Sequence, residues 1–230
     1  MQRWNGWGDE AVSLDLSNQA REMLTDLIGK GRVCPDYSLE KFLEGMPKTR
    51  LSAHSLISFD GKLRLDHSHG QSLADWIGLR GGILKQFPDG VALPETIEEI
   101  RELLRFANEQ NVVVIPYGGG TSVVGHLAVP KTDRPVLSLS LERFNRIINI
   151  DKKSRLAAFE AGIRGPNIEK HLNSKGFTLG HYPQSFEYSS LGGWVVTRSS
   201  GQQSKHFGRI EQLFAGGEVL TPQGPLKLPA

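Results

Sequence analysis

An apolar run that leads into three consecutive glycines constrains this chain more than any other stretch. Residues 112–115 are Val-Val-Val-Ile, a pattern typical of a buried strand, and Pro116 ends the run just before the glycines at 118–120. Consecutive glycines allow backbone dihedral angles closed to other residues and bring N–H groups close to a ligand. The Thr-Ser pair at 121–122 adds uncharged hydroxyl donors. The stretch therefore predicts a phosphate-binding loop, with an ordinary glycine-rich turn as the alternative.

Two familiar phosphate-binding motifs do not fit this loop. Gly120 and Gly125 have the spacing of a nucleoside triphosphatase loop, but His126 follows where that loop needs lysine. A dinucleotide fingerprint would need a glycine where Val123 stands. A phosphate-binding site in this loop would therefore belong to neither the nucleoside triphosphatase class nor the dinucleotide-fingerprint class.

The composition narrows the class of protein. At 230 residues with 38% hydrophobic residues, the chain can form one large or two small soluble domains. A formal net charge of +2 with both signs interspersed argues against nucleic acid as a partner. Cys34 is alone, so neither an internal disulfide nor a cysteine-rich metal cluster is expected. Because the sequence has no run of about eighteen apolar residues, we expect a cytoplasmic location.

Residues 1–86 are predicted to form a small helical N-terminal region. Apolar residues recur with helical spacing over residues 17–28, and tryptophans near the chain start are expected to anchor it by burying their indoles. His67 and His69 could present two imidazoles on one side of a strand, but no cysteine or third histidine lies near them in the sequence. We therefore interpret this histidine pair as part of a solvated polar loop and expect no metal site.

Strands and helices alternate from residue 87 onward. Thr96, with Glu99 three residues later, forms a capping box, which predicts a helix leading into the strand that precedes the glycine loop. A second helix is predicted from Pro166 to Lys175. Strands are predicted at 91–93, 112–115, 136–139, 147–150 and 156–160. The glycine loop thus leaves the second strand of a strand–helix–strand unit.

Residues 180–201 carry the other informative pattern. This stretch combines many hydroxyl side chains with adjacent glycines at 192 and 193 and with Arg198. Ser189 or Ser190 is placed to cap a short helix that begins near Gly192, and a helix N-terminus can bind an anion. A polar loop with tight helix packing is the alternative, but it leaves the cluster of Thr, Arg and Ser at 197–200 unexplained.

Several of these segments match one known family. They are Trp-Asn-Gly-Trp-Gly at 4–8, Ile-Pro-Tyr-Gly-Gly-Gly-Thr-Ser at 115–122, Ala-Gly-Ile at 161–163, Gly-His at 180–181, Ser-Phe-Glu-Tyr-Ser at 185–189, Gly-Gly-Trp at 192–194, Thr-Arg at 197–198, Ser-Gly at 200–201 and Gly-Arg-Ile-Glu at 208–211. With them the chain resembles the flavin-binding half of the vanillyl-alcohol oxidase and p-cresol methylhydroxylase family, and within it the alkyldihydroxyacetonephosphate synthases. The resemblance covers nearly the whole chain.

The resemblance implies an α+β fold. A two-subdomain FAD-binding domain of the p-cresol methylhydroxylase type would span residues 87–230, with a first subdomain at 87–145 and the start of a second, incomplete one at 146–230. It also implies which residues hold FAD. These are Pro116, Tyr117, Gly118, Gly119, Gly120, Thr121 and Ser122 around the pyrophosphate, Gln184, Ser185, Phe186, Glu187, Tyr188, Ser189 and Ser190 along the flavin and ribityl chain, and Gly192, Gly193, Thr197, Arg198, Ser199 and Ser200 as further contacts.

The chain departs from the family pattern in three ways. Gln184 stands where the family commonly has Asp. Thr121 stands where members with covalently attached flavin carry His, so the resemblance implies non-covalent FAD. A Glu-Gly-Thr-Leu-Gly stretch, the substrate domain and the catalytic Tyr and His residues of the family would all follow Ala230. We therefore assign no catalytic residue, and we interpret the chain as a fragment of a longer enzyme or a truncated product, inactive by itself.

Three functions are compatible with this resemblance. The first is the exchange of the acyl group of acyl-dihydroxyacetone phosphate for a fatty alcohol in ether-lipid synthesis, with a lipid substrate. The second is oxidation of a small 2-hydroxy acid, such as lactate or glycolate, by an FAD-dependent oxidoreductase. The third is a cofactor-binding module without catalysis. A homodimer and contact with a membrane surface stay open, and no amphipathic basic helix supports the membrane contact.

Overall fold

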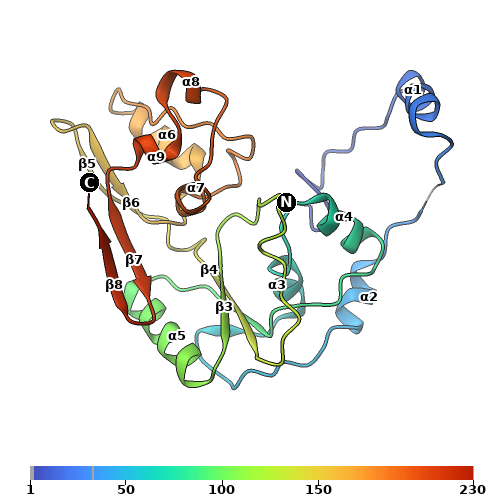
Figure 1. The fold of residues 1–230 in the computed structure, drawn as a ribbon, viewed down its shortest axis with the longest axis horizontal. Helices are drawn as coiled ribbons and strands as arrows, with labels where there is room; N and C mark the ends of the chain where they lie inside the picture. The colour runs from blue at the N-terminus through green and yellow to red at the C-terminus, as the bar shows by residue number, and fades with distance from the viewer. Residues whose placement is uncertain (1–2, 33, 230) are drawn as a thin grey trace.

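A four-stranded sheet organises the first part of the computed structural model, which describes residues 3–32 and 34–229 (Figure 1). Its strands are β1 (Ile57–Ser58), β2 (Gly90–Ala92), β3 (Val113–Tyr117) and β4 (Val136–Ser140), in the order β1-β2-β4-β3. The last three strands run parallel, and β1 pairs with β2 in the antiparallel direction. The three strands predicted in this part of the chain are therefore confirmed. Because β1 lies within residues 1–86, the sheet extends into the N-terminal region.

Helix α5 (Ile97–Glu109) connects β2 to β3. The Thr96 hydroxyl accepts a hydrogen bond from the Glu99 N–H at 3.1 Å, and the Glu99 carboxylate accepts one from the Thr96 N–H at 3.3 Å. The predicted capping box is thus confirmed. The apolar face of α5 joins the sheet in one core cluster of Leu51, Ile57, Ala92, Leu103, Ala107, Val112, Leu137 and Leu139. The core therefore reaches the start of β3 at Val112 and Val114, and pairing with β4 holds the strand up to the glycine loop.

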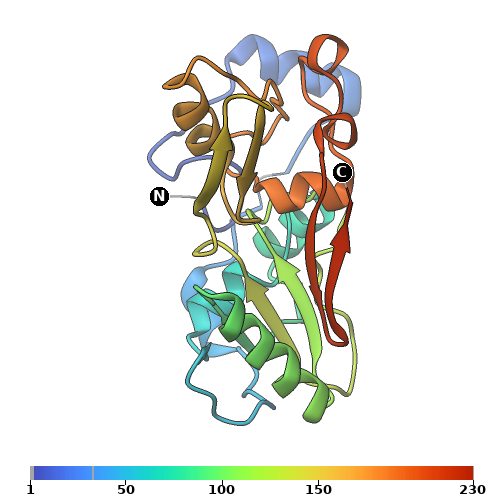
Figure 2. The ribbon, with the colours of Figure 1, turned by 90° about the vertical axis from the view of Figure 1, so that its left-hand side faces the viewer.

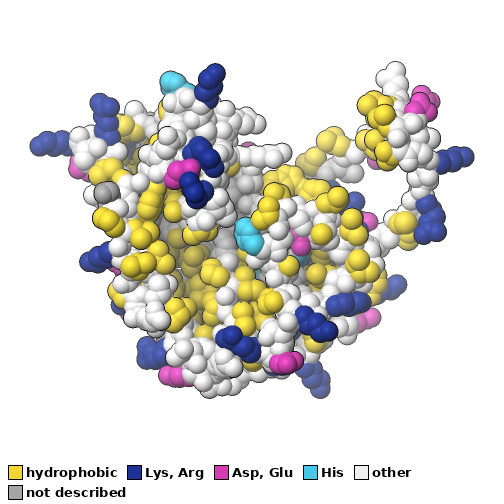
Figure 3. Space-filling model, viewed as in Figure 1, with side chains coloured by type: hydrophobic (Ala, Val, Ile, Leu, Met, Phe, Trp, Pro, Cys, Tyr) yellow, Lys and Arg dark blue, Asp and Glu magenta, His cyan; other side chains and the backbone are white. Residues whose placement is uncertain are grey.

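Helices dominate the N-terminal region, as predicted. They are α1 (Asn18–Ile28), α2 (Leu39–Glu44), α3 (Gly61–Asp66) and α4 (Leu73–Arg80). A second core cluster consists of Phe42, Leu65, Leu79 and Phe87, and the Trp4 ring packs edge-on against Phe42 with 6.0 Å between centroids. Helix α1 stands apart from the body of the molecule, and none of its residues is buried (Figure 1). Its apolar side chains are visible at the surface in Figure 3.

The C-terminal half contains two hairpins and four short helices. These are β5 (Ile147–Asp151), β6 (Leu156–Phe159), α6 (Gly165–Asn173), α7 (Leu191–Thr197), α8 (Ser204–Phe207), α9 (Ile210–Leu213), β7 (Gly217–Thr221) and β8 (Gly224–Leu228). A third core cluster, Ile163, Ile168, Leu172, Trp194 and Ile210, lies among them. The β7–β8 hairpin is separate from β5–β6 and reaches down to α5 (Figure 2). The second sheet predicted from residue 147 is thus two separate two-stranded sheets. None of the described helices is long and apolar enough to cross a membrane.

Candidate functional site

The glycine loop at 118–122 begins where β3 ends. Tyr117, the last residue of β3, is paired in register with Ser140 of β4, so the sheet fixes the start of the loop. Gly120 has a φ of +67°, a conformation that favours glycine. Within the described part of the chain, the backbone N–H groups of residues 118–122 donate no hydrogen bond. None of the β3 residues is fully buried, so the strand is only partly covered. A run of free backbone donors at the end of such a strand suits a phosphate group.

The second stretch singled out in the sequence lies directly against this loop. A Cβ atom on Gly118 would overlap the Ser190 hydroxyl oxygen, and one on Gly119 would overlap the Tyr188 carbonyl oxygen. Ser190 also caps α7, because its Oγ accepts a hydrogen bond from the Gly193 N–H at 3.4 Å. The prediction of a short helix with a serine cap is therefore confirmed. It is the glycines that let the two loops approach so closely.

The contact at Gly119 differs from what the sequence suggests for such a loop. Glycines in a phosphate loop are expected to leave room for the ligand. In the structure, the space beside the Gly119 Cα is instead filled by the backbone of residues 188–189. Gly119 therefore allows the two loops to pack together. The backbone N–H groups of residues 118–122 are the groups of this loop that can still bind a ligand.

The turn at residues 66–71 packs underneath the glycine loop. The Tyr117 hydroxyl donates to the Asp66 carbonyl at 2.8 Å, and the Gln71 N–H donates to the Ser122 carbonyl at 2.6 Å. His67 and His69 are only 6% and 4% exposed. The prediction of a solvated polar loop was therefore wrong, because the glycine loop, which is distant in sequence, covers this turn. No group of three or more potential metal ligands occurs among the described residues.

Burial sets the charge of these groups. It lowers the pKa of the His67 and His69 imidazoles, and it raises the pKa of the Tyr117 phenol. The His67 ring lies 4.4 Å from the Tyr117 ring, centroid to centroid. His69 Nδ1 lies 2.7 Å from the Gly70 carbonyl oxygen, which can only accept, so Nδ1 carries the proton. His69 Nε2 is buried and has no partner among the described residues.

The residues predicted along the second loop divide into surface and core positions. Gln184 and Glu187 are exposed. Phe186 stacks on Trp194 with 6.5 Å between centroids, and Ser189 accepts a hydrogen bond from the Trp194 indole at 2.6 Å. Phe186 and Ser189 therefore pack inside the C-terminal half, whereas Tyr188 and Ser190 reach the glycine loop.

The third predicted group lies at the far end of α7. Thr197 is six residues after Leu191, which corresponds to about 9 Å along a helix. The Thr197 hydroxyl donates to the Gly193 carbonyl at 2.7 Å, and the Arg198 guanidinium lies 3.5 Å from the Glu211 carboxylate. Ser199 Oγ lies 2.7 Å from Nε2 of the buried His181. These side chains have partners within the chain, and a contact between them and a cofactor stays a prediction.

Sequence reasoning overlooked three neighbours of the two loops. The first is the turn at residues 66–71, which the loop covers. The second is Trp7, whose ring packs edge-on against Tyr188 with 5.4 Å between centroids, although the indole is still 39% exposed. The third is Arg164, whose backbone forms an antiparallel bridge with Ser190. A signal for Arg164 was present, because it directly follows the Ala-Gly-Ile match at 161–163.

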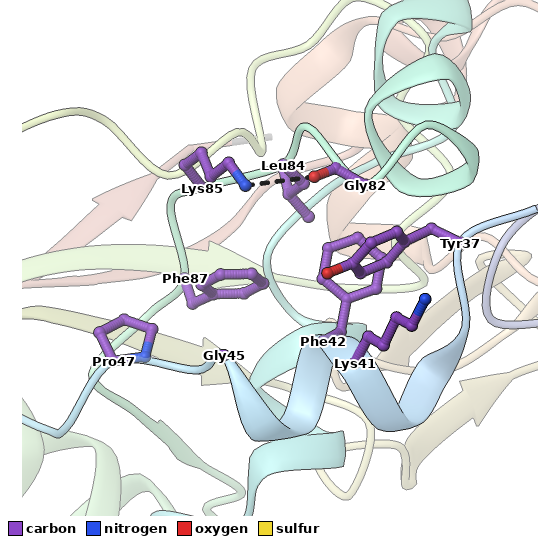
Figure 4. Close-up of a pocket in the computed structure, with 9 residues that line it drawn as sticks. All are labelled: Tyr37, Lys41, Phe42, Gly45, Pro47, Gly82, Leu84, Lys85 and Phe87. Atoms are coloured by element: carbon purple, nitrogen blue, oxygen red, sulfur yellow. Dashed lines mark hydrogen bonds between the residues drawn. The ribbon is translucent and has the colours of Figure 1, made fainter.

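A pocket lies elsewhere, between α2 and the segment after α4 (Figure 4). The Tyr37, Phe42 and Phe87 rings line it, and the Lys85 ammonium donates to the Gly82 carbonyl at 3.2 Å. Its lining includes no Asp, Glu, His, Cys or Ser. The two glycine-containing loops are therefore the better candidate site.

Comparisons with known proteins identify the family of the chain. The FAD binding domain family matches residues 88–227. The alkyldihydroxyacetonephosphate synthase of Dictyostelium discoideum is 42% identical over 170 residues, which are 74% of this chain and 28% of that protein. The synthase of Trypanosoma brucei brucei is 31% identical over 99% of this chain and 42% of its own length. A solved alkyldihydroxyacetonephosphate synthase structure aligns with a TM-score of 0.86 and 32% identity, over 99% of this chain and 49% of that one.

These similarities decide the family. The chain spans less than half the length of the synthases it matches. The structural alignment confirms the α+β FAD-binding fold predicted from the sequence. The matched range includes both loops, and the free backbone donors of residues 118–122 fit the pyrophosphate of a dinucleotide. This chain belongs to the FAD binding domain family, and its cofactor is FAD.

Proposed function

We propose that the full-length protein is an alkyldihydroxyacetonephosphate synthase and that this chain supplies its FAD-binding half. In this reaction the acyl group of acyl-dihydroxyacetone phosphate leaves as a fatty acid, and a fatty alcohol takes its place through an ether bond. The observation that carries the proposal is the similarity to synthases over most of the chain, including both loops of the candidate site. The substrates are therefore a lipid ester and a long-chain alcohol.

The residues of this chain bind and orient the cofactor. The N–H groups of residues 118–122, which donate to no described residue, would hold the pyrophosphate, and Tyr188 and Ser190 pack against them from the second loop. When bound, FAD supplies the electrophilic ring that the exchange requires. Thr121 offers only a hydroxyl where members with covalent flavin carry an imidazole, so FAD is held without a covalent bond.

The test is product analysis with the full-length protein. Incubation with FAD, acyl-dihydroxyacetone phosphate and a long-chain alcohol should yield the ether lipid and one equivalent of fatty acid. Oxidation of a 2-hydroxy acid has less support, because both curated relatives described above are named as synthases. Anaerobic addition of lactate or glycolate should therefore leave the flavin oxidised. Flavin bleaching by a hydroxy acid without ether formation would overturn the synthase proposal.

The cellular setting of the protein is also a proposal. A cytoplasmic location is supported by the absence of a long apolar run in the sequence, and cell fractionation tests it. A homodimer of the full-length protein is tested by sedimentation velocity. A shift of the protein to the membrane fraction that salt does not reverse would contradict the cytoplasmic location.

A further inference from the structure

Arg164 is attached to the second loop beside the glycine loop. It is the N-cap residue of α6, and its backbone forms an antiparallel bridge with Ser190. The Ser190 hydroxyl in turn faces Gly118. On the other side of Arg164, a Cβ atom on Gly165 would overlap the Phe186 ring. The backbone of Arg164 therefore pairs with Ser190, and Ser190 contacts the glycine loop.

The Arg164 guanidinium has no partner in the part of the chain that the structure describes. The four least exposed Lys and Arg residues there are Arg3, Lys62, Arg64 and Arg164. The first three donate to a carbonyl oxygen or a carboxylate of another residue. Arg164 forms no side-chain hydrogen bond and no ion pair with any described residue. The Arg164 nitrogens are not among the fully buried polar atoms, so the guanidinium is open to solvent and its donors are available to a ligand.

Electrostatics place this charge near the base of the glycine loop. The pKa of the Tyr117 phenol is raised by burial first, and then by the carboxylates of Asp66, Asp75 and Glu142. The positive charge of Arg164 opposes this rise. Because Tyr117 immediately precedes the loop, Arg164 acts on the region where an anion would be bound. The segment from 116 to 122 contains no Lys or Arg of its own.

We propose that the Arg164 guanidinium binds the pyrophosphate of FAD and supplies the positive charge that the glycine loop lacks. This inference rests on the proposal that the two loops hold the cofactor. A guanidinium presents a planar fork of donors that matches phosphate oxygens. Arg198, the arginine that the sequence pattern pointed to, is 73% exposed and is already paired with Glu211. Arg164 is therefore the stronger candidate for the charged contact.

The test compares FAD affinity among variants of the full-length protein. Apoprotein of Arg164→Gln, Arg164→Lys and the control Arg105→Gln is titrated with FAD by fluorescence at low and high salt. Arg105 is exposed on α5, and its side chain forms no hydrogen bond or ion pair with any described residue, so its variant removes the same charge away from the loops. Near-ultraviolet circular dichroism of each apoprotein checks that the fold is retained.

Each outcome has a defined meaning. We expect Arg164→Gln to raise the Kd of FAD by about tenfold or more and to reduce its salt dependence, because a charge-assisted contact is lost. Arg164→Lys should raise the Kd less than Arg164→Gln does and should keep the salt dependence, since the charge remains while the forked donor geometry is lost. ADP carries the same diphosphate, so its affinity as a competitor of FAD should fall by the same factor in Arg164→Gln. An unchanged Kd in Arg164→Gln overturns the proposal. The proposal also fails if Arg164→Lys and Arg164→Gln lose the same FAD affinity and the salt dependence is unchanged. That result would indicate that Arg164 stacks on the adenine.

A loop variant separates this proposal from the placement of the cofactor. If Gly119→Val abolishes FAD binding while Arg164→Gln retains it, only the role of Arg164 fails. If Gly119→Val keeps stoichiometric FAD, the cofactor does not lie at these loops. Failure to form an ether product would contradict the proposed reaction but would not affect the conclusion on FAD binding by Arg164.

Discussion

The hydroxyl oxygen of Ser190 occupies the space that a Cβ atom on Gly118 would need. Two loops, separated by about seventy residues of sequence, therefore meet through glycine on one side and a helix cap on the other. Any side chain at Gly118 would push Ser190 away from the N-terminus of α7. The shape of the site and the stability of that helix are thus coupled.

Gly119→Val should destabilise the protein and abolish FAD binding. The new Cβ would overlap the Tyr188 carbonyl oxygen, and overpacking of this kind costs about 1–3 kcal/mol. Thermal unfolding and flavin absorbance measure the two effects. Gly125→Ala is the matched control, because a Cβ there meets nothing within 4 Å although its φ of +76° still causes strain. The control should lose about 1–2 kcal/mol of its free energy of unfolding and keep its FAD. Loss of FAD in both variants would mean that backbone strain alone explains the result.

Tyr117→Phe should lower stability by about 1 kcal/mol. The variant loses the hydrogen bond from the phenol to the Asp66 carbonyl at 2.8 Å, which ties the glycine loop to the turn beneath it. Tyr37→Phe serves as the control, because the Tyr37 hydroxyl donates to no described residue. Denaturant unfolding of both variants gives the difference. Equal changes in the two variants would contradict a specific role for the Tyr117 hydroxyl.

Stability should fall as the pH drops below about 6.5. Burial lowers the pKa of His67 and His69 in the folded protein, so the unfolded chain takes up protons first as the pH falls. Proton uptake by the unfolded state favours unfolding, and the loss continues down to the lower pKa values of the folded state. Thermal unfolding from pH 7.5 to 5 measures the slope. His69→Gln should reduce it, and an unchanged slope would show that other groups dominate.

Asp89→Ala should be among the most damaging substitutions in the sheet. This buried carboxylate accepts hydrogen bonds from the Arg50 backbone N–H at 2.9 Å, from the Arg50 guanidinium at 2.7 and 3.0 Å, and from the Val136 N–H at 2.8 Å. The Arg50 guanidinium is 44% exposed and can be solvated when Asp89 is removed, so the main cost is the buried Val136 N–H left without an acceptor, about 1–3 kcal/mol. The exposed Asp15→Ala control should change stability by less than about 0.5 kcal/mol. A similar midpoint for both variants in urea would refute this role.

FAD should leave the protein completely on acid precipitation. Non-covalent binding predicts that all flavin absorbance appears in the supernatant of the full-length protein treated with trichloroacetic acid. The reason is that Thr121 replaces the histidine that other family members use for attachment. Yellow flavin retained in the washed pellet would show a covalent bond.

Local patterns in the sequence determined most secondary structure. The capping box at Thr96 and Glu99, the glycine run after a valine-rich strand and the serine before Gly192 each depend on neighbours a few residues away, and each was confirmed. The family and its cofactor could also be inferred, because two short motifs in one chain are far more specific than either alone. These features need no knowledge of how distant segments pack.

Only the tertiary structure decided which residues surround the loops. His67 and His69 have the composition of a solvated turn, and they are buried because the glycine loop folds over them. Arg164 and Arg198 are equivalent in chemistry, and only packing leaves Arg164 without a side-chain partner among the described residues and pairs Arg198 with Glu211. Burial and pairing arise from contacts between residues far apart in sequence, and they depend on the relative positions of whole elements. A local pattern fixes a residue's backbone conformation, whereas its electrostatic environment is fixed by the fold.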